Sequence, residues 1–262
     1  MIPKILHLIW LSGSPYPGQV RRCLRSWHRR LPDYEIKVWT QENFDVSQVR
    51  YVREAVQCHR WASASDYIRL WALWTYGGIY LDSDVFIRQS FDSLLSDDFF
   101  SAVEKGNGVY DYSGLLDAEG NLLDAGTWNV PGFGLQAAVL GSVPGHPFVR
   151  KCMEWYEKEP FLLPDGSLSI QTLIAPNVFA RIAVDFGFRY VDCEQSLTEG
   201  IHILPSSAIA SSLRRVNADC LAVHCCNGNW NTWVKRSLRS KIYRKLFPLL
   251  LARLDWHDRL FH

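Results

Sequence analysis

The first 90 residues alternate between short apolar runs and longer amphipathic segments, and this alternation constrains the fold more than any other feature of the chain. Runs of apolar residues bounded by turn residues are typical of buried strands, and apolar side chains at helical spacing are typical of helices. Alternation of the two predicts an α/β fold with a partly parallel sheet. The expected elements are a strand at 5–11, a helix at 19–32, a strand at 34–40, a helix at 60–76 and a strand that begins at Gly77-Gly78.

The second half of the chain continues with less regular signals. A polar, Gly-rich stretch predicts a long excursion at the edge of a site, and three later segments predict further elements. These are the excursion at 105–126, a strand over "GFGLQAAVLGS" (132–142), a turn into a helix over "GHPFVRKCMEWYEK" (145–158), and a helix over 169–187 interrupted near Pro176.

The last 26 residues, 237–262, differ from the rest. They carry six Lys or Arg residues against two Asp, and their Leu and Ile residues recur at helical spacing. A basic amphipathic helix suits the interface of an anionic membrane. A terminal helix that packs its apolar face on the domain explains the pattern equally well. We therefore expect a main domain at 1–236 and a helical C-terminal tail at 237–262.

Composition restricts the partners and the compartment. The formal net charge of +1 gives the whole chain no attraction for nucleic acid, so no nucleic-acid partner is expected. Seven cysteines without a regular framework favour free thiols in a reducing cytoplasm. No signal-peptide pattern and no run of about 20 apolar residues is present, so we expect a cytoplasmic protein whose only membrane contact is peripheral, through its tail.

Two aspartates, Asp82 and Asp84, interrupt the apolar stretch "GGIYLDSDVFI". Residues two apart in a strand point to the same face, so both carboxylates are expected on one face at the carboxyl end of a strand, where α/β sheets bind ligands. Adjacent carboxylates repel each other unless a cation lies between them, and oxygen ligands favour Mg²⁺ or Mn²⁺. The pair predicts a divalent metal with a diphosphate behind it, although a bare DxD also occurs in solvent-facing turns.

Asp66 and Arg69 lie three apart in the preceding helix and are neighbours on one helical face. The surrounding segment is apolar, which places the pair beside the sheet rather than in open water. Two interpretations remain open: a plain ion pair, or a pair that holds sugar hydroxyls with the carboxylate accepting and the guanidinium donating.

These features together resemble a known family. "IPKILHLIW", "SWHRRLPDYEIKVW" and above all "ASASDYIRLWALWTYGGIYLDSDV" are similar to the DXD-containing glycosyltransferases of family thirty-two. That family includes capsular-polysaccharide sugar transferases and the yeast initiating mannosyltransferase, and is distantly similar to clostridial glucosylating toxin domains. "GSVPGHPFVRKCMEWY", "IAPNVF" and "HCCNGNW" agree with it. The resemblance covers roughly residues 2–233 and implies a GT-A-like, Rossmann-like nucleotide-sugar-binding mixed sheet flanked by helices, followed by a helical extension.

The resemblance also implies roles for individual residues. Asp84 and, through water, Asp82 would bind Mn²⁺ or Mg²⁺, and Asp82 would also reach the donor. Asp66 and Arg69 would hold the donor sugar and take part in catalysis with Asp82. His224 would complete the metal shell, although a satisfied strand-end histidine is an equal alternative.

Three further positions carry expectations from the resemblance. Trp10 would lie against the nucleobase, and Trp230 would offer its indole N–H to the diphosphate. The chain departs from the family at Asn229, where relatives have Ser, and at Gln136, where relatives often have Asn. Both keep a polar side chain, and we expect Asn229 to contact the donor and Gln136 to act near the reacting sugar.

The implied activity is a metal-dependent, retaining transfer of a hexose from a nucleotide sugar, with a UDP-sugar the expected donor, to a glycan or lipid-linked glycan acceptor. Two alternatives use the same residues differently. "YLDSDV" also fits the DxD strand of haloacid-dehalogenase-like phosphatases, in which the first Asp is the nucleophile. A catalytically silent carbohydrate-binding protein would keep the fold without turnover.

Overall fold

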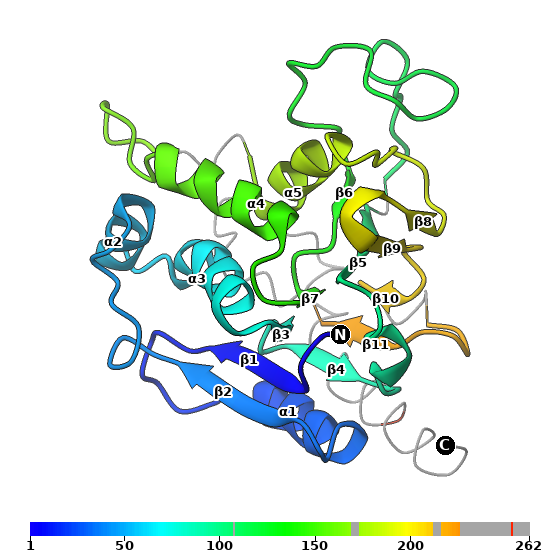
Figure 1. Cartoon of the computed structure of the whole chain (residues 1–262). Coiled ribbons are helices and arrows are strands. Elements are labelled where there is room, and N and C mark those ends of the chain that lie inside the picture. Colours follow the sequence, from blue (N-terminus) through cyan, green and yellow to red (C-terminus); the bar gives the residue numbers. More distant parts are fainter. Residues whose placement is uncertain (107, 169–172, 212–215, 226–252, 254–262) are drawn as a thin grey trace.

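A mixed β-sheet runs through the centre of the molecule, with helices on both of its faces (Figure 1). The computed structural model describes residues 1–106, 108–168, 173–211, 216–225 and 253. Within these ranges the strand order is β2-β1-β3-β7-β5-β9-β8, with β6 paired to β5, and a smaller sheet has the order β10-β11-β4. The strands are β1 (Ile5–Ile9), β2 (Glu35–Trp39), β3 (Gly78–Leu81), β4 (Val85–Ile87), β5 (Phe99–Lys105), β6 (Phe133–Leu135), β7 (Val139–Ser142), β8 (Gln195–Ser196), β9 (Ile201–Leu204), β10 (Ile209–Ala210) and β11 (Ala222–His224).

The helices follow the sequence pattern in most places. The described α-helices are α1 (Gly18–Arg30), α2 (Arg50–Gln57), α3 (Trp61–Tyr76), α4 (Pro147–Lys158) and α5 (Ala175–Val184), with short 3₁₀ turns at Asp92–Leu94 and Thr198–Gly200. β1 pairs in parallel with both β2 and β3, whereas β7 runs antiparallel to β3 and β5. The expected α/β fold class with a partly parallel, mixed sheet is therefore confirmed.

Three expectations about elements were wrong in detail. The strand expected over 132–142 is broken into β6 and β7: the N–H of Gln136 still bonds to β5, at the carbonyl oxygen of Ala102, but the N–H of Ala138 bonds to the side chain of Gln136 instead of a neighbouring strand. Of the interrupted helix expected over 169–187, residues 169–172 lie outside the described residues, and the described helix begins at Ala175, with Pro176 in its first turn, where the missing N–H costs nothing. The aspartates do not belong to a strand, as described below.

Two apolar clusters fill the two faces of the sheet. α2, α3, α4 and α5 cover one face, and α1 lies on the other with the small sheet (Figure 1). Strand alternation distributes side chains between them: in β3, Ile79 and Leu81 join the α1 side, whereas Tyr80 joins the α3 side. None of the helices in the described part of the chain is long and apolar enough to span a bilayer.

A glycine elbow carries the chain from α3 into β3. Gly77 and Gly78 both have positive φ, at 63° and 99°, which ends the helix and turns the chain at once into the sheet. A Cβ on Gly78 would lie 2.6 Å from the carbonyl oxygen of Ile5. The two glycines predicted from the sequence as a helix end are therefore required by backbone conformation and by close packing on β1.

His7 secures this elbow from inside the core. Its side chain is fully buried, and its Nδ1 accepts a hydrogen bond from Trp39 Nε1 at 3.1 Å. The proton must then lie on Nε2, which donates to the carbonyl oxygen of Gly77 at 2.7 Å. Burial lowers the pKa of His7 from 6.5 to about 4, so the imidazole is neutral in the folded protein at neutral pH.

We expect His7 to make the protein sensitive to mild acid. Because its pKa is lower in the folded state, its contribution to stability is present above pH 6.5 and is lost as the pH falls toward about 4. The loss between pH 7 and pH 5 is about 2 kcal/mol. Urea unfolding at the two pH values measures it, and His7→Gln supplies the background from all other groups. A His7→Gln variant that loses as much stability as the unmodified protein over this interval would contradict the prediction.

Candidate active site

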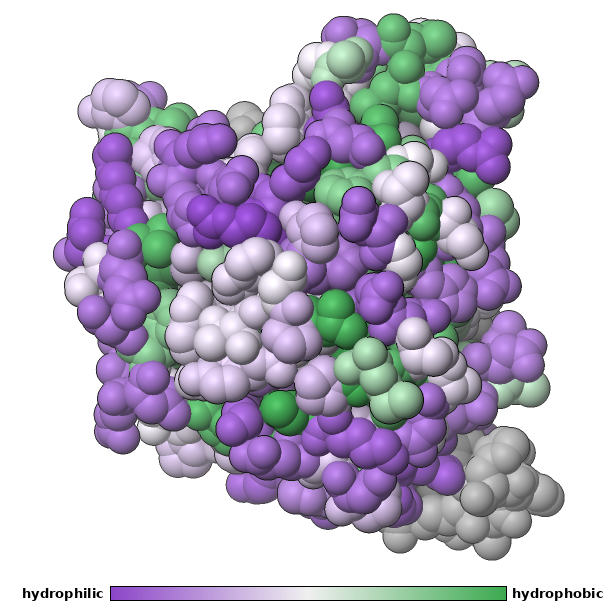
Figure 2. Space-filling model, in the orientation of Figure 1, coloured by the Kyte–Doolittle hydropathy of each residue, from purple (hydrophilic) through white to green (hydrophobic). Residues whose placement is uncertain are grey.

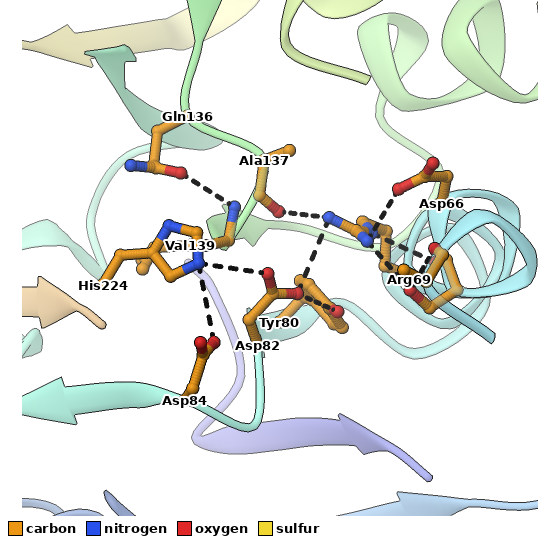
Figure 3. A network of polar contacts seen from close by, with 12 residues as sticks. Asp66, Arg69, Tyr80, Asp82, Asp84, Gln136, Ala137, Val139 and His224 are labelled. Carbon is orange, nitrogen blue, oxygen red and sulfur yellow. Dashed lines mark hydrogen bonds and ion pairs between the residues drawn. The ribbon is translucent and has the colours of Figure 1, made fainter. Parts of the chain in front are cut away.

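Asp82 and Asp84 lie in a tight turn between β3 and β4 (Figure 3). β3 ends at Leu81, and the N–H of Val85 bonds to the carbonyl oxygen of Asp82 at 2.9 Å, which closes the turn. The expectation that strand alternation places both carboxylates on one face was therefore wrong. They are brought together by the turn. The backbone of the turn is held by two further hydrogen bonds: the N–H of Asp82 donates to the carbonyl oxygen of Ala138 at 2.9 Å, and the N–H of Cys225 donates to the carbonyl oxygen of Asp84 at 3.0 Å.

His224 completes a cluster with the two aspartates. It ends β11, which pairs antiparallel with β4 so that His224 lies opposite Val85. Its Nε2 is 3.5 Å from Asp84 Oδ1 and 3.6 Å from Asp82 Oδ2. One ligand atom from each of the three residues lies within 4.8 Å of the others. Figure 3 shows the imidazole directed at both carboxylates.

This donor set fits a divalent cation. Octahedral bonds of about 2.1 Å separate neighbouring ligand atoms by about 3 Å, close to the spacing across the cluster. Two carboxylates and one neutral imidazole neutralise most of a dication's charge and leave coordination positions for substrate and water. All three side chains are also partly exposed, which leaves a route for a ligand to reach them. The expected metal-binding group of Asp82, Asp84 and His224 is thus assembled by the fold, while the identity of the metal stays a prediction.

Arg69 connects the helix to the aspartate turn. Its side chain is 5% exposed, and its Nη2 forms an ion pair with Asp66 Oδ1 at 2.7 Å. Nη1 donates to the carbonyl oxygen of Ala137 at 2.7 Å and lies 3.8 Å from Asp82 Oδ1. Nε and Nη2 also donate to the backbone and hydroxyl oxygens of Ser65, at 3.0 and 2.9 Å. All three guanidinium nitrogens are therefore engaged by the protein, which favours a role in positioning Asp66 and Asp82.

Tyr80 orients the first aspartate and was not singled out by the sequence. Its hydroxyl donates a short hydrogen bond to Asp82 Oδ1, and the Arg69 guanidinium lies 4.6 Å from its ring centroid. Tyr80 is 2% exposed, and burial holds the pKa of its phenol well above the usual value. The phenol therefore stays a hydrogen-bond donor, and Asp82 Oδ2 is the oxygen left to face His224.

Two carboxyl groups beside the cluster are desolvated. Burial raises the pKa of Asp66 to about 7, with Arg69 opposing the rise and Asp82 adding to it. Burial also raises the pKa of Glu104 in β5. The charge of His224 opposes this rise, and the charge of Asp82 adds to it. Carboxyl groups with raised pKa values gather at functional sites. Glu104 had no sequence signal, because only the pairing of β5 brings it to the site.

Gln136 lies next to the same turn. It is 1% exposed, and its Oε1 accepts a hydrogen bond from the N–H of Ala138 at 3.1 Å, so its orientation is fixed by the break between β6 and β7. The carbonyl oxygen of Ala137 accepts a hydrogen bond from Arg69, and that of Ala138 accepts one from the N–H of Asp82. The structure therefore places Gln136 beside the cluster, and its predicted part in catalysis stays a prediction.

Three predicted site residues have no described contact with the cluster: Trp10 is described, whereas Asn229 and Trp230 are not. Trp10 follows β1, is partly exposed, and donates from Nε1 to the carbonyl oxygen of Ser14 at 2.7 Å, with Tyr16 at its edge. Its contact with a nucleobase stays a prediction. Asn229 and Trp230 lie outside the described residues, as does nearly all of the tail at 237–262.

Comparisons with known proteins find similarity to glycosyltransferases. Residues 17–101 match the family described as "Glycosyltransferase sugar-binding region containing DXD motif". Inositol phosphoceramide mannosyltransferase 2 of Schizosaccharomyces pombe is 28% identical over 186 residues, which are 66% of this chain and 46% of that protein. An uncharacterized glycosyltransferase of Acanthamoeba polyphaga mimivirus is 21% identical over 252 residues, 93% of this chain and 88% of that protein. The chain thus spans less than half the length of the fission-yeast relative.

Solved glycosyltransferase structures are also similar to this chain. PaToxG glycosyltransferase is 15% identical with a TM-score of 0.46, covering 70% of this chain and 69% of that one. The galactosyltransferase LgtC, solved with donor and acceptor sugar analogs, is 13% identical with a TM-score of 0.41, covering 85% and 87%. At these TM-scores the likeness adds nothing to the topology described above.

Proposed function

We propose that this chain is a metal-dependent, retaining glycosyltransferase that moves a hexose from a nucleotide sugar, with UDP the expected nucleotide, to a glycan acceptor. The observation that carries the proposal is the Asp82–Asp84–His224 cluster, in which Arg69 and Tyr80 both contact Oδ1 of Asp82. Sugar transfer from a nucleotide sugar leaves negative charge on the departing diphosphate. A divalent ion held by the cluster, Mn²⁺ in our proposal, would supply the positive charge that stabilises this leaving group.

The protein groups around the cluster have separate tasks in this proposal. Asp66, held by Arg69 at 2.7 Å and 17% exposed in its side chain, keeps an oxygen available for a donor hydroxyl. Asp82 is fixed by Tyr80 and Arg69 on one oxygen, so the other is free to turn toward the metal or the ribose. Gln136 borders the reacting sugar. Pre-oriented groups of this kind stabilise charge in the transition state without reorganisation.

The acceptor is proposed to be a polysaccharide or a lipid-linked glycan handled at the cytoplasmic face of a membrane. The name of the fission-yeast relative describes a sugar acceptor built on a ceramide lipid, which supports a lipid-linked acceptor here as well. The phosphatase alternative is less well supported, because one oxygen of Asp82, its required nucleophile, already accepts a hydrogen bond from Tyr80 and forms an ion pair with Arg69.

A panel of nucleotide sugars tests the proposal. We expect hydrolysis of one UDP-sugar in the presence of Mn²⁺, loss of that activity with a chelator, and recovery when Mn²⁺ is returned. The test measures release of the nucleoside diphosphate, with GDP-mannose included because the fission-yeast relative is named a mannosyltransferase. Release of phosphate from simple phosphomonoesters would contradict the proposal and favour the phosphatase. Donor binding unaffected by metal, without turnover, would favour a silent carbohydrate-binding protein.

A further inference from the structure

Helix α1 has an outer face made almost entirely of basic residues. Its exposed residues are Gly18, Arg21, Arg25, His28 and Arg29, and the helix contains no Asp or Glu. Arg21, Arg25 and Arg29 are spaced by four residues, so they form one row along the helix. Arg21 and Arg25 form no ion pair with any described residue. Like charges at this spacing destabilise a helix, so the row brings no evident benefit to the fold.

Three acidic side chains from segments next to α1 pair with lysines instead of Arg21 or Arg25. Asp33 and Asp92, close to the C-terminal end of α1, both pair with Lys4. Glu35, at the start of β2, pairs with Lys37 at 3.1 Å. Figure 2 shows hydrophilic residues along the lower margin of the molecule, where Figure 1 places α1 and β2. A local positive surface therefore exists on a chain whose net charge is only +1.

The inner face of α1 is joined directly to the aspartate turn. The indole N–H of Trp27, which is fully buried, donates to the carbonyl oxygen of Val85 at 2.7 Å. The hydroxyl of Ser26 accepts from the N–H of Ile87 at 2.9 Å. Val85 is the residue that follows Asp84. Because these bonds tie α1 to β4, a surface that binds the arginine row also sets the orientation of the candidate active site.

We propose that the arginine row of α1 docks the protein on an anionic lipid surface. Each basic residue near such a surface strengthens binding about fivefold, so three in one row give about a hundredfold. A lipid surface is favoured over nucleic acid because the outer face of α1 has no Phe, Tyr or Trp on which bases could stack, and the chain lacks an overall positive field. This inference does not depend on sugar transfer; if both hold, docking brings the site to lipid-linked acceptors.

Vesicle sedimentation with the full chain tests the proposal. The probes are phosphatidylcholine vesicles with and without about 30% phosphatidylglycerol, the anionic component that the row is expected to need. The variant is Arg21→Gln/Arg25→Gln/Arg29→Gln, since glutamine keeps helix propensity while removing charge. The matched control removes three charges from the opposite helical layer, as Arg53→Gln/Lys151→Gln/Lys158→Gln. All three are exposed, on α2 and α4.

We expect the α1 variant to bind anionic vesicles about a hundredfold more weakly, and the control to bind like the unmodified chain. Circular-dichroism melting and metal-dependent donor hydrolysis should be unchanged in both variants. Equal loss in the control, or no loss in the α1 variant, would overturn the proposal. So would equal binding to neutral vesicles, or tighter binding to DNA at the same phosphate concentration. Any contribution of the C-terminal tail is present in all three proteins and cancels.

Discussion

Asp84→Asn is expected to lower metal-dependent sugar transfer by about a thousandfold or more while leaving the protein folded. The change keeps the size of the side chain but removes one of two carboxylates that face His224. Loss of that charge weakens the hold on a divalent ion at the point where the leaving diphosphate needs it. Without metal, the same change relieves repulsion with Asp82, so the free energy of unfolding of the metal-free protein should stay equal or rise slightly.

Two measurements separate these effects. Donor hydrolysis at saturating Mn²⁺ reports turnover, and the rise in melting temperature on adding Mn²⁺ reports binding, because a ligand of the folded state stabilises it. Asp185→Asn is the matched control, since Asp185 is an aspartate near the end of α5, where it pairs with Lys151 and Arg181. Undiminished transfer by Asp84→Asn, with an unchanged melting shift, would rule out the metal-binding assignment.

Arg69→Met is expected to destabilise the protein by about 3–5 kcal/mol, the usual cost of removing one partner from a buried ion pair. The substitution leaves Asp66 and Asp82 without their cation and the carbonyl oxygen of Ala137 without its donor. Methionine fills much of the volume, so the loss reports electrostatics and hydrogen bonding rather than a cavity. Urea unfolding at neutral pH measures it.

An exposed arginine provides the comparison for this change. Arg150 donates two hydrogen bonds to Glu157 at 2.9 Å, but its side chain is 38% exposed. Arg150→Met should therefore cost less than about 1 kcal/mol. Adding Asp66→Asn to Arg69→Met should recover part of the loss, because one unpaired carboxylate is removed. A cost for Arg69→Met no larger than that for Arg150→Met would show that the buried network contributes little to stability.

Local spacing was enough to predict the elements around the aspartates. The helix ending at Gly77-Gly78, the i,i+3 neighbours Asp66 and Arg69, and the approach of the following strand all depend on residues close in the chain. Helical and strand periods are properties of the backbone itself, so they can be read from a sequence. Local signals failed where a turn or break interrupts a strand, as at Asp82 and at Gln136, because such breaks depend on bonds to distant segments.

The chain's own sequence determined an α/β fold, a glycine-ended helix and two carboxylates at the close of its third strand. Only the tertiary structure decided that Tyr80 and Arg69 hold the same oxygen of Asp82, that Glu104 interacts electrostatically with Asp82 and His224, and that β11 places His224 opposite Val85. It also decided that α1 turns its arginines outward while Trp27 holds β4. The physical reason is that strand pairing and burial join segments far apart in the chain, and no local period specifies which distant segment becomes the neighbour.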